Sequence, residues 1–361
     1  MNVPKLFLAL CGAAALCGSL LRAGPTGGGY RLIAKYDLGA APGGKEYWDY
    51  MAFDPSARRL YISHNTEVKV VEADTGKIVG SIADLKRVHG IALVPQLAKG
   101  FISDGGADEA VVFDFKTLQV RGHIKTGGNP DCIIYDTASK HIFTMNGKTN
   151  DSSVIDPATD TIVATIPMGG RPEYAVSDGK GTIYDNIEDK NEVVALDSRT
   201  NAIKSRWPIA PAEEATAMDM DVKHHRLFIG GRNKLLAIMD AETGKVIRTF
   251  PIGAGVDTNI YEPETGLVFT ATREGTLHIF MKTHPTNSVS SKPLKLNSAR
   301  AMRLLTPRRT ASSSTRRTLA LLPSPRRSNR TRSLRRSQEH SASSSTGSDH
   351  LGSARCRRGL L

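Results

Sequence analysis

The chain has 361 residues and a formal net charge of +12, so its length allows one large all-β domain or two ordinary domains. The positive charge by itself suggests nucleic-acid binding, but it is distributed unevenly along the chain. Residues 283–361 hold 17 Lys and Arg against two acidic residues, whereas residues 1–282 hold 31 against 34. The larger part is mildly acidic, and nucleic acid is not expected to be its partner.

The N-terminus has the pattern of a secretory signal peptide. Lys5 precedes the apolar run Leu6–Leu21, and Ala23 offers a small residue for cleavage. The run is about 16 residues long, shorter than the roughly 20 needed to cross a bilayer, and no other stretch qualifies as a transmembrane segment. We therefore expect residues 1–23 to be removed and the mature protein to be periplasmic or extracellular, without a transmembrane segment.

The cysteines do not form a metal-binding motif or a motif for covalent haem attachment. Cys11 and Cys17 lie within the signal, which leaves Cys132 and Cys356, and no CxxC occurs. Cys132 is expected to be a small buried apolar residue.

A repeat of about 42 residues begins after a single strand-like segment, residues 30–39. One marker is an apolar strand core whose aromatic residue falls at Tyr61, Phe101, Phe143, Tyr184, Phe228 and Phe269. A second marker is an acidic residue three positions before a threonine, at 72/75, 114/117, 156/159, 197/200 and 240/243. Two independent markers therefore share one period.

Each repeat contains four short strand patterns separated by turn residues, which is typical of a β-propeller blade. The sequence predicts an all-β propeller over residues 24–282, with blades beginning near residues 48, 89, 130, 172, 215 and 257. The segment 30–39 resembles a fourth strand, and in a closed ring it would complete a last blade supplied by the C-terminus. A seventh blade near residues 298–340 is missing or degenerate in sequence.

The repeats resemble the YVTN-repeat (YncE-like) β-propeller family. The resemblance is carried by Leu60–Asn65 (LYISHN) and Ile155–Asp160 (IDPATD), and it covers roughly residues 30–280. It implies a seven-bladed fold and export to the bacterial periplasm or cell surface, but no particular activity. The chain departs from the motif at His64-Asn65 and Asp104-Gly105, where the family has Thr-Asn, and after Phe280, where the pattern stops.

Residues 283–361 form a basic tail rich in Arg and Ser, with no Phe, Tyr or Trp. Low hydrophobicity with like charge favours disorder. Two alternatives are a basic arm that binds nucleic acid or anionic polymers, and a shifted reading frame that has replaced the last blade.

Candidate site residues come from the predicted start of each innermost strand. Four of these six residues carry a carboxylate and one is a histidine. The six are Asp49, His89, Asp131, Glu173, Thr216 and Asp257. Residues expected on the same face of the ring are Glu213, Glu214, His64, Asp104, Asn146 and Asn186. Such an acidic ring would attract cations, with Ca²⁺ or Mg²⁺ as candidates and no other cofactor expected. The alternative is that each carboxylate caps its own loop.

Three functions remain open at this point. The first is an exported binding or scaffold protein that takes a small molecule, peptide or glycan at the mouth of the channel. The second is an enzyme, such as a metal-assisted lactonase or hydrolase, at the same mouth; no catalytic motif supports it. The third is a cell-envelope platform for protein partners.

Overall fold

The computed structural model describes residues 34–44, 46–282, 289–295 and 320–321, all within the unit Met1–Pro325. The expected signal peptide, residues 30–33 of the predicted first strand and most of the basic tail lie outside the described residues. No helix in the described ranges is long and apolar enough to span a membrane.

The described residues form six four-stranded antiparallel sheets, each with its strands in chain order, and one two-stranded sheet. The first three blades are β2 (Trp48–Asp54), β3 (Arg59–His64), β4 (Glu67–Glu72), β5 (Ile78–Ile82); β6 (Val88–Val94), β7 (Lys99–Asp104), β8 (Glu109–Asp114), β9 (Val120–Lys125); and β10 (Pro130–Asp136), β11 (His141–Asn146), β12 (Asp151–Asp156), β13 (Thr161–Pro167). The other three are β14 (Pro172–Ser177), β15 (Thr182–Ile187), β16 (Glu192–Asp197), β17 (Ala202–Pro208); β18 (Ala215–Asp221), β19 (Arg226–Gly231), β20 (Leu235–Asp240), β21 (Val246–Pro251); and β22 (Val256–Glu262), β23 (Leu267–Thr272), β24 (Thr276–Lys282), β25 (Val289–Lys295).

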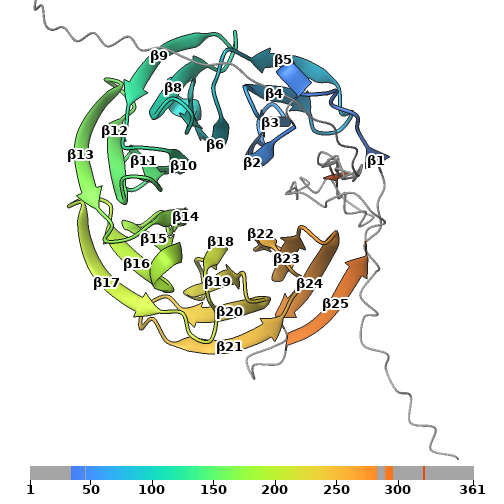
Figure 1. Ribbon diagram of the computed structural model, residues 1–361, viewed down its shortest axis with the longest axis vertical. Coiled ribbons are helices and arrows are strands. Elements are labelled where there is room, and N and C mark those ends of the chain that lie inside the picture. Colours follow the sequence, from blue (N-terminus) through green and yellow to red (C-terminus); the bar gives the residue numbers. More distant parts are fainter. Residues whose placement is uncertain (1–33, 45, 283–288, 296–319, 322–361) are drawn as a thin grey trace, which may run out of the picture. The chain divides into compact units, whose positions relative to one another are not determined.

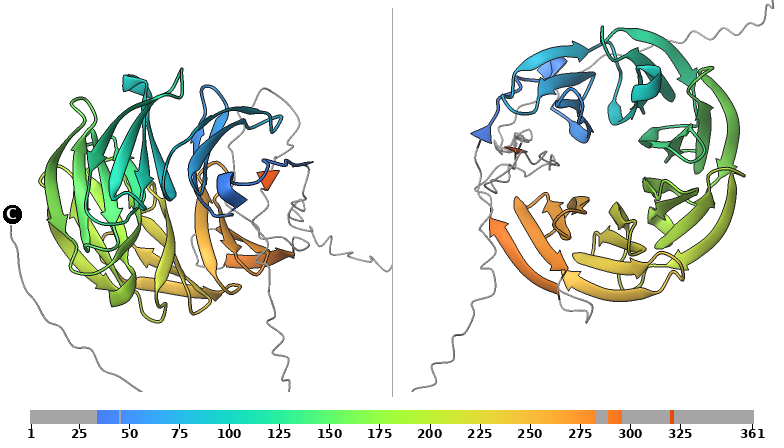
Figure 2. Two further views of the ribbon diagram at one scale, coloured as in Figure 1. Left: turned by 45° about the horizontal axis from the view of Figure 1, so that its top comes forward. Right: turned by 180° about the vertical axis from the view of Figure 1, so that it is seen from behind.

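The blades follow one another round a ring, with the first strand of each blade nearest the centre and the fourth at the periphery (Figure 1). Innermost strands of consecutive blades pack together, from β2 against β6 through to β18 against β22. The view from behind and the tilted view show the same radial arrangement (Figure 2). The prediction of an all-β propeller with six visible blades is confirmed, and a seventh blade is not among the described residues.

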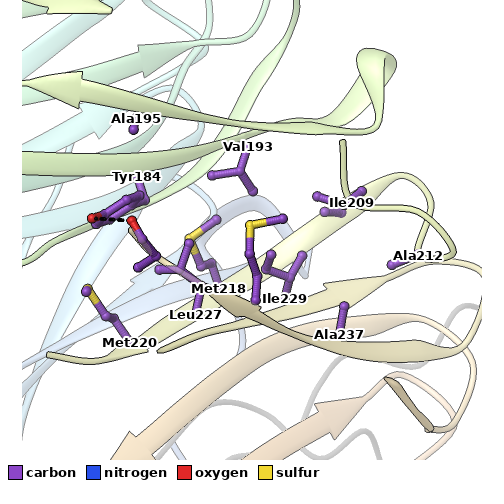
Figure 3. Close-up of a cluster of buried hydrophobic side chains, with 13 residues drawn as sticks. Tyr184, Val193, Ala195, Ile209, Ala212, Met218, Met220, Leu227, Ile229 and Ala237 are labelled. Atoms are coloured by element: carbon purple, nitrogen blue, oxygen red, sulfur yellow. Dashed lines mark hydrogen bonds between the residues drawn. The ribbon is translucent and has the colours of Figure 1, made fainter. Parts of the chain in front are cut away.

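The core lies between the blades rather than inside any one of them. Second strands such as β3, β7 and β11 are buried along nearly their whole length. Apolar residues fill their middle positions, and each ends in buried polar residues such as His64, Asp104 and Asn146. Figure 3 shows the cluster between the fourth and fifth blades, where the Tyr184 hydroxyl donates to the Ala241 carbonyl at 3.1 Å. Fully burying an aliphatic side chain there contributes about 1.5–3 kcal/mol.

The first and sixth blades differ from the rest because each packs against one other blade in the described part of the chain. Blade 1 has an apolar cluster on its remaining face, centred on Trp48 and Leu60 and covered by Tyr36 and Leu38. Blade 6 has its own small cluster around Phe269.

The short strand β1 (Ala34–Lys35) lies outside the six blades and pairs in parallel with β26 (Ala320–Leu321). Completion of a seventh blade by residues 30–39 stays a prediction. Strand β25 pairs with β24 and belongs to blade 6, although composition places its residues in the basic tail.

Candidate functional site

A β-bulge opens the innermost strand of every blade. Two residues of that strand lie opposite one residue of the second strand, as Asp49 and Tyr50 do opposite Ser63. The first residues of the six bulges are Asp49, His89, Asp131, Glu173, Thr216 and Asp257. Bulges re-aim side chains, and here they set the predicted residues at equivalent places around the centre of the ring.

Three of these residues, from consecutive blades, converge into a cluster that we call the triad: Asp49, His89 and Asp131. Their candidate ligand atoms all lie within 4.8 Å of one another. His89 Nδ1 is 2.6 Å from Asp49 Oδ2 and 3.6 Å from Asp131 Oδ1. His89 is buried, and the carboxylates are largely shielded from solvent.

Neighbouring groups hold the triad in place. The Tyr47 hydroxyl donates to Asp49 Oδ2 at 3.0 Å, and the Arg87 guanidinium lies 5.1 Å from the centre of the Tyr47 ring. Burial alone would lower the pKa of His89, but Asp131 and Asp49 outweigh it and raise the pKa above its ordinary value. The raised pKa favours the protonated form of His89, whose charge offsets part of the charge of the two carboxylates.

Glu173 continues the acidic surface into blade 4. Burial, together with the charges of Asp131 and Glu188, raises the pKa of Glu173 to about 9. The Tyr50 hydroxyl donates to the Glu173 carbonyl oxygen at 3.3 Å, which ties this bulge to the one in blade 1.

Asp185 on β15 lies beside Glu173 and was missed by the sequence analysis. Neither of its oxygens accepts a hydrogen bond of normal geometry from the described residues. Burial and the charge of Glu173 raise the pKa of Asp185 well above its ordinary value, and the Glu173 backbone N–H opposes the rise only in part. The repeat could have identified Asp185 as unusual. The residues of β3, β7 and β11 at the same register are Ile62, Ile102 and Thr144, none of which is acidic.

Glu188 was also missed, and it joins two arginines near Glu173. It is buried in a 3₁₀ turn (Glu188–Lys190) and pairs with Arg171 at 2.8 Å and Arg232 at 2.9 Å. The charge of Arg232 also lowers the pKa of Glu173, which opposes the effects of burial and of the nearby acids. The mouth is therefore mixed in charge rather than uniformly acidic.

Two other bulge residues are engaged away from the triad. Asp257 pairs with Arg273 at 2.9 Å, and the Thr216 hydroxyl donates to the Val256 carbonyl at 2.9 Å. Glu214 lies in the loop before β18, where its backbone N–H donates to Asn191 Oδ1 at 2.6 Å.

The predicted turn residues His64, Asn146 and Asn186 have partners elsewhere. His64 stacks on Trp48 with ring centroids 3.6 Å apart, and its Nε2 lies 3.0 Å from Glu46 Oε2. Asn146 Nδ2 donates to Ser153 Oγ at 2.9 Å, and Asn186 Nδ2 donates to the Ala217 carbonyl at 3.4 Å. The structure does not bring these three side chains to the triad.

No family model matches the sequence, and no curated protein matches it. Among solved structures, a chain in the crystal structure of a mitotic checkpoint complex matches with a TM-score of 0.63 and 14% sequence identity. The match covers 83% of this chain and 91% of that chain. At this identity the likeness shows a shared fold and nothing about ligand or activity.

Proposed function

We propose that this protein is an exported binding propeller whose channel mouth takes a divalent cation, alone or as part of a larger ligand, at Asp49, His89 and Asp131. The observation that carries this proposal is the convergence of three potential ligands, from three blades, within 4.8 Å. One cation can contact all three at the roughly 2.0–2.6 Å typical of Mg²⁺ and Ca²⁺. Two carboxylates and one imidazole suit a hard or borderline ion.

Binding at the triad would be linked to protons. His89 must give up its Nδ1 proton before that nitrogen can coordinate a cation, and the two carboxylates that raise its pKa would then be neutralised by the ion instead. We therefore expect cation affinity to increase as His89 deprotonates.

Membership of the YVTN-repeat family and export from the cell belong to the same proposal. The repeat motifs and residues 1–23 support them. Mass spectrometry of the mature chain after bacterial expression tests export, since cleavage after Ala23 is the expected result.

Calorimetric titration of the full mature chain with Ca²⁺, and separately with Mg²⁺, tests the triad. The double variant Asp49→Asn with Asp131→Asn should lose binding. Asp257→Asn is the matched control, because Asp257 occupies the same bulge position but pairs with Arg273. Unchanged binding by the double variant would overturn the proposal.

A hydrolytic enzyme is a second candidate, favoured by the state of Glu173. With a pKa of about 9 this carboxyl is protonated at neutral pH, which suits a general acid close to a cation. Metal-dependent hydrolysis of a lactone or ester, lost in Glu173→Gln, would support catalysis.

A protein-interaction platform is the third candidate, favoured by the rim of the ring. Large apolar side chains are exposed on the outermost strands of four blades: Ile78, Val120, Ile162, Val163 and Ile247. Chemical crosslinking of purified chain in cell-envelope extract, compared with a variant that carries Thr at these five positions, tests whether this rim recruits partners.

A further inference from the structure

Arg87 is an exposed arginine in the loop that leads into β6, and one tyrosine connects it to the triad. Its guanidinium carbon lies 5.1 Å from the centre of the Tyr47 ring. The Tyr47 hydroxyl lies 3.0 Å from Asp49 Oδ2 and 3.4 Å from His89 Nδ1, which are both candidate cation ligands. Burial is the main cause of the raised pKa of Tyr47, and the positive charge of Arg87 opposes that rise. The guanidinium therefore lies within electrostatic reach of the triad's surroundings.

Buried Asp104 fixes the backbone of this loop. Its two carboxylate oxygens accept hydrogen bonds from the backbone N–H groups of Lys86 and Arg87, each at 2.8 Å. The N–H of Gly105 donates to the Arg87 carbonyl at 2.9 Å. A Cβ at Gly105 would lie 2.7 Å from His89 Cδ2, so a side chain there would displace the histidine. The Asp104-Gly105 pair, which departs from the repeat motif, therefore positions both Arg87 and His89.

Arg87 differs from other arginines of the mouth because no carboxylate among the described residues pairs with its guanidinium. It lies over the Tyr47 ring instead, which leaves its N–H donors to solvent or to a ligand. The other arginines each pair with an acid: Arg171 and Arg232 with Glu188, and Arg273 with Asp257.

The triad would leave part of a bound ion's coordination open. Ca²⁺ takes about 6–8 ligands and Mg²⁺ about 6, whereas the triad supplies three side chains. Asp49 and Asp131 together balance the charge of a divalent ion, so the charge of Arg87 is still unbalanced. An anionic ligand meets both conditions, because its oxygens can complete the coordination and its charge balances the guanidinium. Mg²⁺ in proteins is commonly held in this way, by one or two carboxylates together with phosphate oxygens.

We propose that the ligand of the mouth is a small oxyanion, a carboxylate or phosphate compound, that contacts both the triad cation and the Arg87 guanidinium. The planar fork of an arginine matches the paired oxygens of carboxylate and phosphate groups. Tyr47 is a positioning residue, since its ring supports Arg87 and its hydroxyl holds Asp49. This inference rests on the proposed cation site, because the cation is one of the two groups that hold the anion.

Calorimetric titration of the Mg²⁺-saturated full mature chain with inorganic phosphate, and separately with acetate, tests the inference. At least one of the two anions should bind, and it should bind more weakly once a chelator has removed the cation. Tighter binding of phosphate assigns a phosphate group to the ligand, and tighter binding of acetate assigns a carboxylate.

Arg87→Gln should weaken the anion at least about tenfold, the loss expected for a hydrogen bond to a charged group. It should bind Mg²⁺ no less tightly than the wild type, because it removes a positive charge from beside the site. Arg273→Gln is the matched control and should bind both ions as the wild type does, since Arg273 pairs with Asp257.

Arg87→Gln should fold, because Asp104 holds the loop through backbone N–H groups that the substitution leaves in place. Arg87→Lys is a second variant that keeps the charge but loses the planar fork, so it should lose part of the anion affinity. If Arg87 were only structural, both variants would lower thermal stability and leave the anion affinity of the folded chain unchanged.

The outcomes separate the two proposals. Mg²⁺ binding without anion binding, or with an anion affinity that Arg87→Gln leaves unchanged, overturns the oxyanion site and leaves the cation site. An anion affinity that is the same with Mg²⁺ and with chelator also overturns the shared contact with the cation. Absence of Mg²⁺ binding by the wild-type chain overturns both proposals.

Discussion

Asp185 and Asp219 are two aspartates, one blade apart, in different surroundings: Asp185 is fully buried, and Asp219 is half-buried. Asp219 receives two backbone N–H donors, and its pKa is raised by burial only to about 6. Asp185 receives only a partial contribution from the Glu173 backbone N–H, and burial together with the charge of Glu173 raises its pKa well above its ordinary value. The same residue type therefore accepts two good hydrogen bonds at one blade contact and none of normal geometry at the other.

The comparison teaches that burial alone does not mark a functional residue. A carboxylate that accepts backbone hydrogen bonds is part of the architecture, because the donors would otherwise be unsatisfied. A carboxyl that lacks those donors weakens the fold unless something else binds it. This distinction predicts how substitutions, an added cation and pH should change the stability of the chain.

Asp219→Ala should lower the free energy of unfolding by about 2–5 kcal/mol, because it leaves two buried backbone N–H groups without an acceptor. Urea denaturation followed by circular dichroism measures the change. A loss below about 1 kcal/mol would show that these hydrogen bonds do not stabilise the contact between blades 5 and 6.

A divalent cation at 100 times the dissociation constant should stabilise the wild-type chain by about 2.7 kcal/mol. The double variant Asp49→Asn with Asp131→Asn should lose this shift, whereas Asp219→Asn should keep it. Thermal melting with calcium and with chelator gives the two values for each variant. Equal calcium shifts in wild type and the double variant would contradict binding at the triad.

Without added cation, stability should fall as pH rises towards 9. The folded chain holds a proton on Glu173 up to a pKa of about 9, whereas the unfolded value is 4.5. The native state therefore binds more protons between these values, and stability present below pH 4.5 is lost as pH rises through 9. Glu173→Gln should reduce the loss between pH 7 and 9 by at least about 1 kcal/mol, the free energy of one pKa unit. Parallel pH profiles of the two proteins would contradict this assignment.

Asp185→Ile should have the smallest effect, within about 1 kcal/mol of the cation-free wild type. It installs the residue found at this register in blades 1 and 2, so the lost carboxyl is replaced by a side chain that the architecture accepts. Denaturation in the presence of chelator measures it. A loss of several kcal/mol would make Asp185 a structural residue like Asp219.

The repeat made the fold and half of the site predictable. A fixed period identifies equivalent residues, so Asp49, His89 and Asp131 could be aligned from the sequence alone. The bulges bring them together in the structure. The period does not say which partners a side chain meets across a turn. His64 lies at the end of β3, but it stacks on Trp48 and its Nε2 lies 3.0 Å from Glu46 Oε2.

A one-residue difference explains the position of Asn186. Strands β3 and β11 end at His64 and Asn146, whereas β15 ends at Ile187, so Asn186 lies one position earlier. Because side chains alternate between faces, Asn186 meets blade 5 instead. Asp185 was missed for a different reason: only its deep burial and its lack of hydrogen bonds of normal geometry distinguish it, and both depend on residues distant in sequence.

Blades 1 and 6 each pack against one other blade in the described part of the chain, which has a consequence for exchange with solvent. In a linear array of repeats the terminal units are held by one interface and open more readily than the middle units. Amide hydrogen exchange should therefore be fastest in β2–β5 and β22–β25 and slowest in β10–β17. The triad joins Asp49 of the terminal blade 1 to His89 and Asp131 of blades 2 and 3. An ion bound at the triad would link blade 1 more firmly to blades 2 and 3. It should therefore slow amide exchange in blade 1 and leave the exchange rate of blade 6 unchanged.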